Sequence, residues 1–167
     1  RYTTARGTAE RATDTAFSIL GRTPPACRTT DTPLLGGDIP NMAAFVAEAT
    51  EETADAVDAL TGKRLACSYG SRYHDVVQTM KDDPSLVAPL SDSCPITRGE
   101  ILHAVRHEMA VRLADAVLRR TEAGSAGHPG RAAMVEAARV MGAEIGWTDD
   151  RREREVEHAE QDYRLDP

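Results

Sequence analysis

The sequence predicts an all-α fold, in which a bundle-like helical domain follows one separate helix. Three observations predict this class. Apolar residues recur at spacings of three and four along most of the chain, which is typical of amphipathic helices. Residues suited to cap or end a helix stand at the limits of these patterns. No useful stretch alternates apolar and polar residues as a half-buried strand does.

Composition indicates a globular protein with one domain, or with one domain and part of another. Hydrophobic residues make up 41% of the 167 residues and aromatic residues only 4%, so alanine and aliphatic side chains must fill the interior. The net charge of −7 argues against a general nucleic-acid binder, which needs clustered basic side chains. The longest stretch without Asp, Glu, Lys or Arg is nine residues, 39–47, whereas a membrane-spanning helix needs about 20 apolar residues.

The start of the chain and its cysteines suggest its origin. The sequence opens on Arg1 without an initiator Met, and a helical pattern begins almost at once, so we interpret it as a piece of a longer protein. Cys27, Cys67 and Cys94 are widely spaced and form no Cys-x-x-Cys pair. This usage favours reduced thiols in a cytoplasmic protein over a disulfide framework or a zinc site.

The first expected helix covers residues 3–20. Thr3 or Thr4 can cap it, and Gly21 can end it. Its small and apolar residues recur on one face: Ala5, Ala9, Ala12, Ala16 and Ile19. Residues 22–40 then hold four of the nine prolines and a Gly-Gly pair, which indicates a linker or long surface loop. We therefore divide the chain into 1–22, a Pro/Gly-rich linker 23–40, and a helical domain 41–167.

The domain begins with three helical segments. Asn41 can cap the first, which carries Met42, Phe45, Val46 and Ala49. The second covers roughly residues 54–69 and ends at Gly70, and a short third covers 73–80. Prolines then predict an irregular connection, at positions Pro84, Pro89 and Pro95.

A long helix is expected from Thr97 to about Glu122. Thr97 and Glu100 fit the Thr-x-x-Glu capping box. The expected buried stripe comprises Leu102, Val105, Met109, Leu113 and Ala116. After a break at 124–130, an amphipathic pattern with Met134, Ala138, Met141 and Ile145 ends at Gly146. Thr148 begins the last helix, where Asp149 and Asp150 suit the positive end of the helix dipole.

Candidate chemistry in the domain is weak. His103 and His107 could share a metal ion, but without a third ligand we favour surface or partly buried histidines. Arg119-Arg120 could bind a phosphate or carboxylate, or simply suit the negative end of a helix dipole. The loop 124–130 lacks a phosphate-loop ending, and the charge-alternating tail 149–162 is typical of a solvated helix face. We therefore expect no catalytic residue and no metal site.

The first helix has the opposite charge. Residues 1–30 carry a net charge of +3, which leaves −10 for the rest of the chain. Arg1, Thr3, Thr4 and Arg6 crowd a helix start, where unpaired amides and the dipole attract anions. A phosphate or the N1/O2 edge of a flavin would suit this site, and a plain capped surface helix is the alternative.

Several segments, taken in order, resemble one family. Arg1-Tyr2-Thr3-Thr4-Ala5-Arg6, followed by Ala9-Glu10, is similar to the Gly-Gly-Lys-x-Thr-Thr-x-Arg-x-x-Ala-Glu segment of FAD-dependent (aerobic-type) glycerol-3-phosphate dehydrogenases and alpha-glycerophosphate oxidases. The segment from Glu100-Ile101 to Arg119-Arg120-Thr121 resembles the family's long-helix signature. Further matches are Pro33-Leu34-Leu35-Gly36-Gly37, Tyr69-Gly70-Ser71, and Met141, Glu144 and Gly146-Trp147 followed by Arg151 and Glu155.

The resemblance implies that residues 1–22 are the last helix of a flavin domain and that 41–167 form the C-terminal domain. The parent enzyme would oxidise sn-glycerol 3-phosphate to dihydroxyacetone phosphate and pass electrons from FAD to a quinone or another acceptor. Within the chain, Thr3 and Thr4 would face the flavin edge, and Arg1 would lie near the flavin or the substrate phosphate. The chain alone would be inactive, because the family's nucleotide-binding fingerprint is absent from it.

The resemblance also implies partners and a location. The chain's partner would be the parent flavin domain, a homo-oligomer is compatible with the family, and nucleic acid is not expected. The parent would be cytoplasmic and peripheral on the inner face of the cytoplasmic membrane. The alternative is a non-catalytic helical protein-interaction module that shares only ancestry with the dehydrogenase domain.

Overall fold

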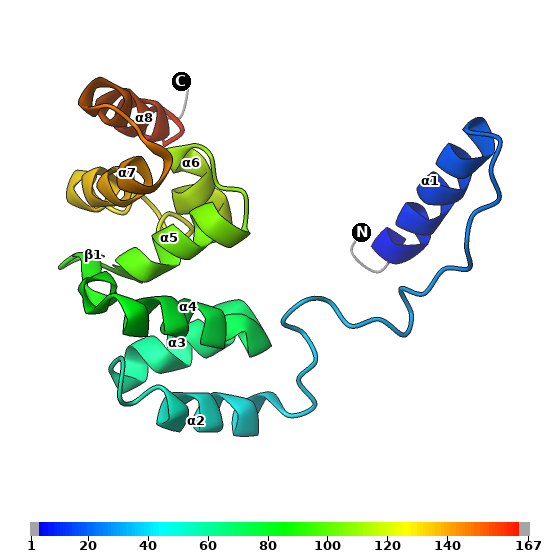
Figure 1. Cartoon of the computed structure of the whole chain (residues 1–167), viewed down its shortest axis with the longest axis horizontal. Coiled ribbons are helices and arrows are strands. Elements are labelled where there is room, and N and C mark those ends of the chain that lie inside the picture. The colour runs from blue at the N-terminus through cyan, green and yellow to red at the C-terminus, as the bar shows by residue number, and fades with distance from the viewer. Residues whose placement is uncertain (1–3, 164–167) are drawn as a thin grey trace. The chain divides into compact units, whose positions relative to one another are not determined.

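The computed structural model describes residues 4–163, and the chain divides into two units, Arg1–Asp38 and Ile39–Pro167. The first unit contains helix α1 (Ala5–Ile19), shown in Figure 1. Thr4 is the N-cap residue of α1, and the expected end at Gly21 is confirmed, since Gly21 has a φ of 66°. No residue of α1 is buried, and the described residues 20–38 form neither helix nor strand.

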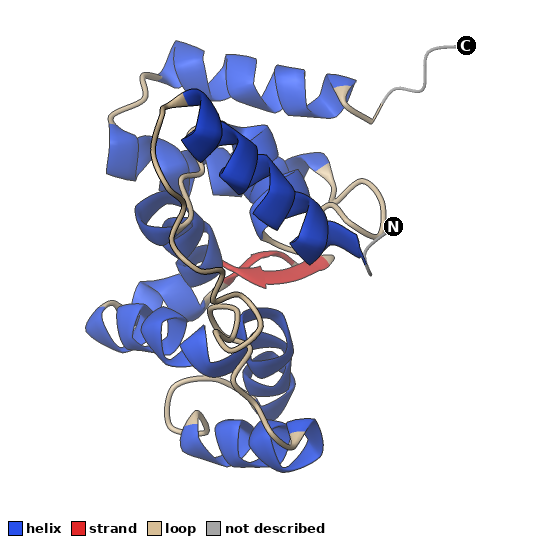
Figure 2. Cartoon of the chain, turned by 90° about the vertical axis from the view of Figure 1, so that its right-hand side faces the viewer, coloured by secondary structure: helices blue, strands red, loops and turns tan. Residues whose placement is uncertain are grey.

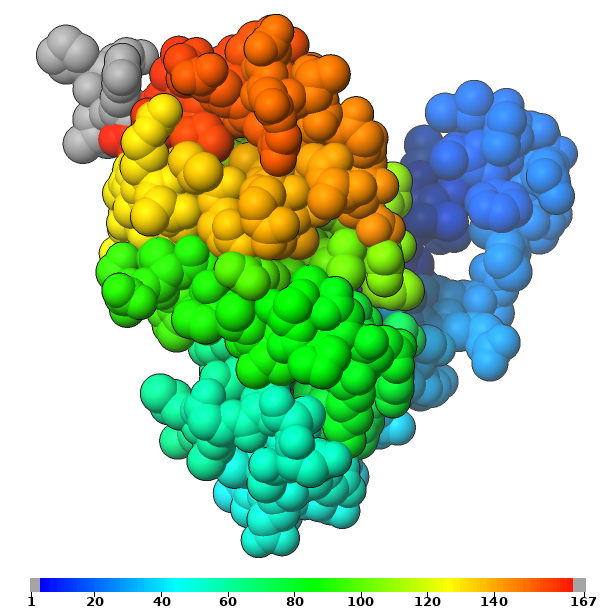
Figure 3. All heavy atoms as spheres, turned by 60° about the vertical axis from the view of Figure 1, so that its left-hand side comes forward, coloured from blue at the N-terminus to red at the C-terminus, as the bar shows by residue number. Residues whose placement is uncertain are grey.

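The second unit is a stack of helices. Within it, Figures 1 and 3 show α2–α4 at one end, α5 with a small hairpin in the middle, and α7 with α8 at the other end. The elements, in chain order, are α2 (Met42–Glu52), α3 (Ala59–Tyr69), η2 (Gly70–Arg72), α4 (Tyr73–Asp82), η3 (Pro84–Val87), β1 (Pro89–Ser91), β2 (Cys94–Thr97), α5 (Arg98–His107), α6 (Leu113–Asp115), η4 (Ala116–Arg120), α7 (Arg131–Ile145) and α8 (Asp149–Gln161).

Side-chain caps begin most of these helices, as the sequence predicts. The Asn41 side chain accepts the Ala44 amide at 3.1 Å, and the Thr148 hydroxyl accepts the Arg151 amide at 3.3 Å. Thr97 and Glu100 form the expected capping box. The segment expected from residue 54 becomes helical only at Ala59, because Asp58 accepts the amides of the first turn of α3.

The prediction of one long helix from Thr97 to about Glu122 is wrong. Helix α5 ends at His107, and Met109 adopts a left-handed conformation with a φ of 60°. The chain then restarts at α6, where the Asp115 carboxylate accepts the Val111 and Arg112 amides at 3.2 and 3.0 Å. Carboxylates that satisfy the first amides of a new helix stabilise the restart, although the apolar spacing is compatible with continuation. Met109, expected in the buried stripe, is 83% exposed.

The connection with three prolines also differs from its prediction. It contains a short antiparallel hairpin, drawn in red in Figure 2, in which Pro89 pairs with Thr97 and Ser91 with Cys94. Proline is tolerated at strand ends and on edge strands, and a two-stranded ribbon consists only of edges. These two strands are the only sheet among residues 4–163, so the all-α class is confirmed.

The hydrophobic core runs through the second unit. Its largest fully buried apolar side chains come from α3, α4, α5, α6 and α7, namely Leu65, Tyr73, Met80, Ile101, Leu113, Met134 and Met141. Close helix contact depends on Gly62, because a Cβ there would collide with the Thr53 hydroxyl. In the part of the chain that the structure describes, no helix has the length and apolar character needed to cross a membrane.

Candidate functional site

The predicted flavin-edge residues belong to the start of α1. Arg1 and Thr3 lie outside the described residues. Thr4 is described, and its carbonyl accepts the Thr8 hydroxyl at 3.0 Å. The first turn of α1 contains no acidic residue. The positive end of the helix dipole is therefore not neutralised by side chains of that turn.

The predicted histidine pair lies on α5. The His103 and His107 rings are 4.8 Å apart, and His103 also packs edge-on against Tyr69, with ring centroids at 5.5 Å. His103 is 4% exposed, whereas His107 is exposed. Among the described residues, no group of three or more His, Cys, Asp or Glu side chains could hold a metal ion. Burial, and secondarily His107, lowers the pKa of His103, which favours the neutral ring.

Three buried polar atoms around this pair have no hydrogen-bond partner in the described structure. They are the Tyr69 hydroxyl, His103 Nδ1 and Glu108 Oε2. The three residues come from the end of α3, the middle of α5 and the C-cap position of α5. We call Tyr69, His103 and Glu108 the α3–α5 polar cluster. Unpaired buried polar atoms are rare in folded proteins and cost about 1–3 kcal/mol each, so this cluster is a candidate binding site.

Burial and neighbouring charges shift the pKa values of Glu108 and Tyr69 as well. Burial raises the pKa of Glu108, and the nearby cations Arg120 and His107 partly oppose this rise. Burial also raises the pKa of Tyr69, and the Glu108 and Glu100 carboxylates add to the effect. Neutral phenol and carboxylic acid groups can both donate and accept a hydrogen bond. The arrangement can recognise a polar group, but it contains no nucleophile activated by a base.

The predicted Arg119-Arg120 site is occupied in part by internal pairs. Both arginines end η4, a π-helical turn in which the Thr121 amide bonds to the Ala116 carbonyl at 3.0 Å. Arg119 pairs with Asp115 at 3.3 Å. Beside them lies a polar pocket of about 280 Å³, lined by Cys67, Ser68, Tyr69, Glu100, Arg119, Arg120, Thr121 and Glu122. The two glutamates make this pocket unsuited to a simple anion site.

The glycine-rich loop 124–130 is a packed helix connection. Tyr163 donates its hydroxyl to the Gly124 carbonyl at 3.2 Å, and its ring lies 4.9 Å from that of His128. The Gly130 amide donates to His128 Nδ1 at 3.0 Å. These contacts hold the loop against Tyr163 and against its own His128 side chain. They agree with the predicted role of the loop as a connection between helices.

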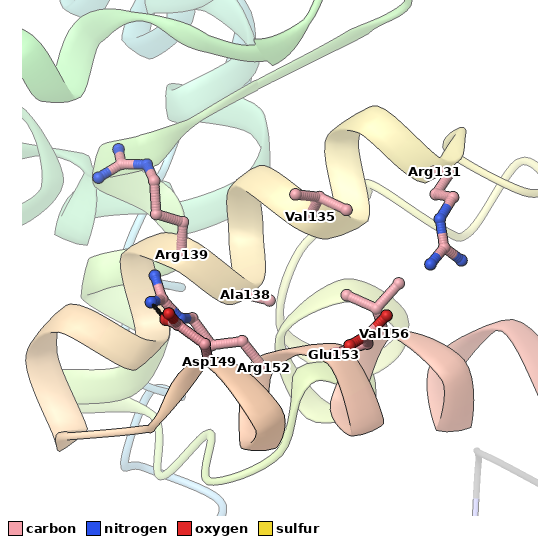
Figure 4. A pocket seen from close by; sticks show the side chains of 8 residues that line it. All are labelled: Arg131, Val135, Ala138, Arg139, Asp149, Arg152, Glu153 and Val156. Atoms are coloured by element: carbon pink, nitrogen blue, oxygen red, sulfur yellow. Dashed lines mark hydrogen bonds and ion pairs between the residues drawn. The ribbon is translucent and has the colours of Figure 1, made fainter.

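A groove of about 370 Å³ runs between α7 and α8 (Figure 4). Its apolar floor contains Val135, Ala138 and Val156. Charged side chains lie along its sides, and its arginines are already paired: Arg131 with Glu160, Arg139 with Glu136, and Arg152 with Asp149. The groove therefore offers no unpaired cation for an anionic ligand.

Sequence reasoning assigned no chemistry to Tyr69 or Glu108. In the structure Glu108 is the C-cap residue of α5, where the helix dipole disfavours a carboxylate, and this position would be a signal if the helix end were known. The signal was hidden because the predicted helix continued past residue 108. Tyr69 is part of the Tyr69-Gly70-Ser71 match, but the sequence does not indicate its burial, which depends on contacts between α3 and α5, segments that lie far apart in sequence.

Comparison with known proteins places these features in context. The model of the family described as the C-terminal domain of alpha-glycerophosphate oxidase matches residues 27–152. A glycerol-3-phosphate dehydrogenase of Synechocystis is 25% identical over 158 residues, which cover 94% of this chain and 28% of that protein. Glycerol-3-phosphate dehydrogenase 2 of Mycobacterium tuberculosis is 31% identical over 163 residues, which cover 93% of this chain and 27% of that protein.

A third relative, the glycerol-3-phosphate dehydrogenase of Mycobacterium leprae, is 29% identical over 163 residues, with 93% of this chain and 27% of that protein covered. The chain therefore spans little more than a quarter of the length of the curated relatives it matches. The family match begins at residue 27, so α1 lies outside it. The dehydrogenase matches, which cover 93–94% of the chain, extend into α1.

Proposed function

The chain belongs to the family of the C-terminal domain of alpha-glycerophosphate oxidase, and we propose that it serves as that domain in an FAD-dependent glycerol-3-phosphate dehydrogenase. The observation that carries the proposal is the family match over residues 27–152. Dehydrogenase relatives aligned over nearly the whole chain support it. The parent enzyme would oxidise sn-glycerol 3-phosphate to dihydroxyacetone phosphate. It would pass the electrons to a quinone-type acceptor while associated peripherally with the inner face of the cytoplasmic membrane.

Within this enzyme, residues 41–167 form a packing and docking domain, and residues 1–22 are the last helix of the flavin domain. Two observations support this division: α1 precedes the family match, which begins at residue 27, and no residue of α1 is buried. An apolar helix face with Ala9, Ala12, Ala16 and Ile19 would then pack on the flavin domain. Residues 23–40 connect the two parts.

The start of α1 is compatible with a flavin edge. Backbone amides at a helix N-terminus attract negative charge, and the first turn of α1 has no acidic residue to oppose it. Arg1, Thr3 and Thr4 would hold the polar edge of the isoalloxazine ring. Bound FAD would supply the acceptor for the hydride equivalent removed from C2 of the substrate.

The test uses the full-length parent protein and the 167-residue chain side by side. We expect the full-length protein to be yellow and to reduce a dye with glycerol 3-phosphate, and the chain alone to be colourless and inactive. Thr3→Val with Thr4→Val in the full-length protein should lower flavin content or slow flavin reduction, and Thr13→Val with Thr15→Val, on the same helix, is the matched control. Turnover by the chain alone, or an unchanged flavin content and rate in the first double variant, would contradict the respective assignment.

A further inference from the structure

We draw no further inference here: the strongest candidate, the groove of about 370 Å³ between α7 and α8 with its apolar floor of Val135, Ala138 and Val156, carries nothing because its arginines are paired within the chain and nothing in the structure shows what covers it.

Discussion

Helices α1 and α7 have the same length, 15 residues, and both are rich in alanine, yet they differ in burial. No residue of α1 is buried, whereas α7 buries Ala133, Met134, Ala137, Ala138, Val140, Met141 and Gly142. The periodicity of apolar residues predicts both helices, but it does not reveal what covers them. Helix α7 packs against α5 and α8 of its own unit. Isolated helices shorter than about 12–15 residues are marginal in water, so α1 is the element whose stability depends most on a partner.

The largest expected difference between the two helices is in hydrogen exchange. In the 167-residue chain, we expect the central amides of α7 to exchange at least about a thousandfold more slowly than those of α1, because α7 opens only with the core. Mass spectrometry with peptide resolution can measure both helices in one sample. Similar protection in α1 and α7 would show that α1 has a partner within the chain.

Truncation of a core side chain should sharpen the contrast. Met141 is fully buried, and Met141→Ala should lower the free energy of unfolding by about 3 kcal/mol through lost burial and a cavity. Ile19 is 80% exposed, and Ile19→Ala should change it by less than about 0.5 kcal/mol. Urea unfolding followed by circular dichroism measures both. A comparable loss of unfolding free energy in both variants would contradict the difference in burial between α7 and α1.

A buried carboxylate provides the next contrast. Glu155 on α8 is 2% exposed, accepts the Leu113 amide at 3.0 Å and pairs with Arg151 at 2.6 Å. Glu155→Gln should lower the free energy of unfolding by about 2 kcal/mol, since it weakens charge-assisted hydrogen bonds that join α8 to the start of α6. In α1, Glu10→Gln breaks only a 3.9 Å surface pair with Arg6 and should have little effect on the urea midpoint.

The smallest expected effect is a pH dependence at the α3–α5 polar cluster. Glu108 has a raised pKa in the folded protein, so its stabilising contribution is complete below the ordinary pKa of 4.5 and is lost as pH rises through the raised value. Glu108→Gln should therefore stabilise the chain by about 0.5 kcal/mol at pH 7, kept small by solvent screening, and should have no such benefit at pH 4. Unfolding midpoints at the two pH values decide this.

His103 titrates in the opposite sense and provides the internal comparison. Its pKa is lowered in the folded protein, so its contribution is complete above the ordinary pKa of 6.5 and is lost as pH falls below that value. His103→Asn should therefore make the free energy of unfolding depend less on pH between pH 7 and pH 5. A wild-type chain whose stability does not fall in this window would contradict the burial of a neutral ring.

Local chemistry explains what could be predicted about the fold. Asn41, Thr97 with Glu100, and Thr148 begin helices because their side chains satisfy neighbouring amides, and this information lies within four residues of sequence. The break at Met109 could not be predicted in the same way. The segment between His107 and Leu113 contains residues that a helix tolerates. Asp115 satisfies two amides of the restart locally, but the Leu113 amide is accepted by Glu155, which lies far along the chain.

The candidate sites divide along the same line. The helix start at Thr4 could be predicted because helix limits and the dipole are local features, but the Thr4 side chain does not form the expected cap hydrogen bond with an amide of α1. Its role toward a flavin stays a prediction. The α3–α5 polar cluster could not, because Tyr69 contacts His103 only after α3 and α5 have packed. Resemblance to a family identified the domain, but it did not indicate which buried polar atoms lack a hydrogen-bond partner.

The π-helical turn η4 has a consequence for evolutionary comparison. A π-turn closes its hydrogen bond over one more residue than an α-turn, so Ala116–Arg120 behaves as a local insertion of one residue. In a relative with one residue fewer between Leu113 and Thr121, an ordinary α-turn would span the same distance. The side chains before the turn would then keep their directions, while Arg119 and Arg120, at its end, would point in other directions. Alignment gaps at this turn therefore distinguish relatives that share the orientation of these arginines from those that share only their spacing.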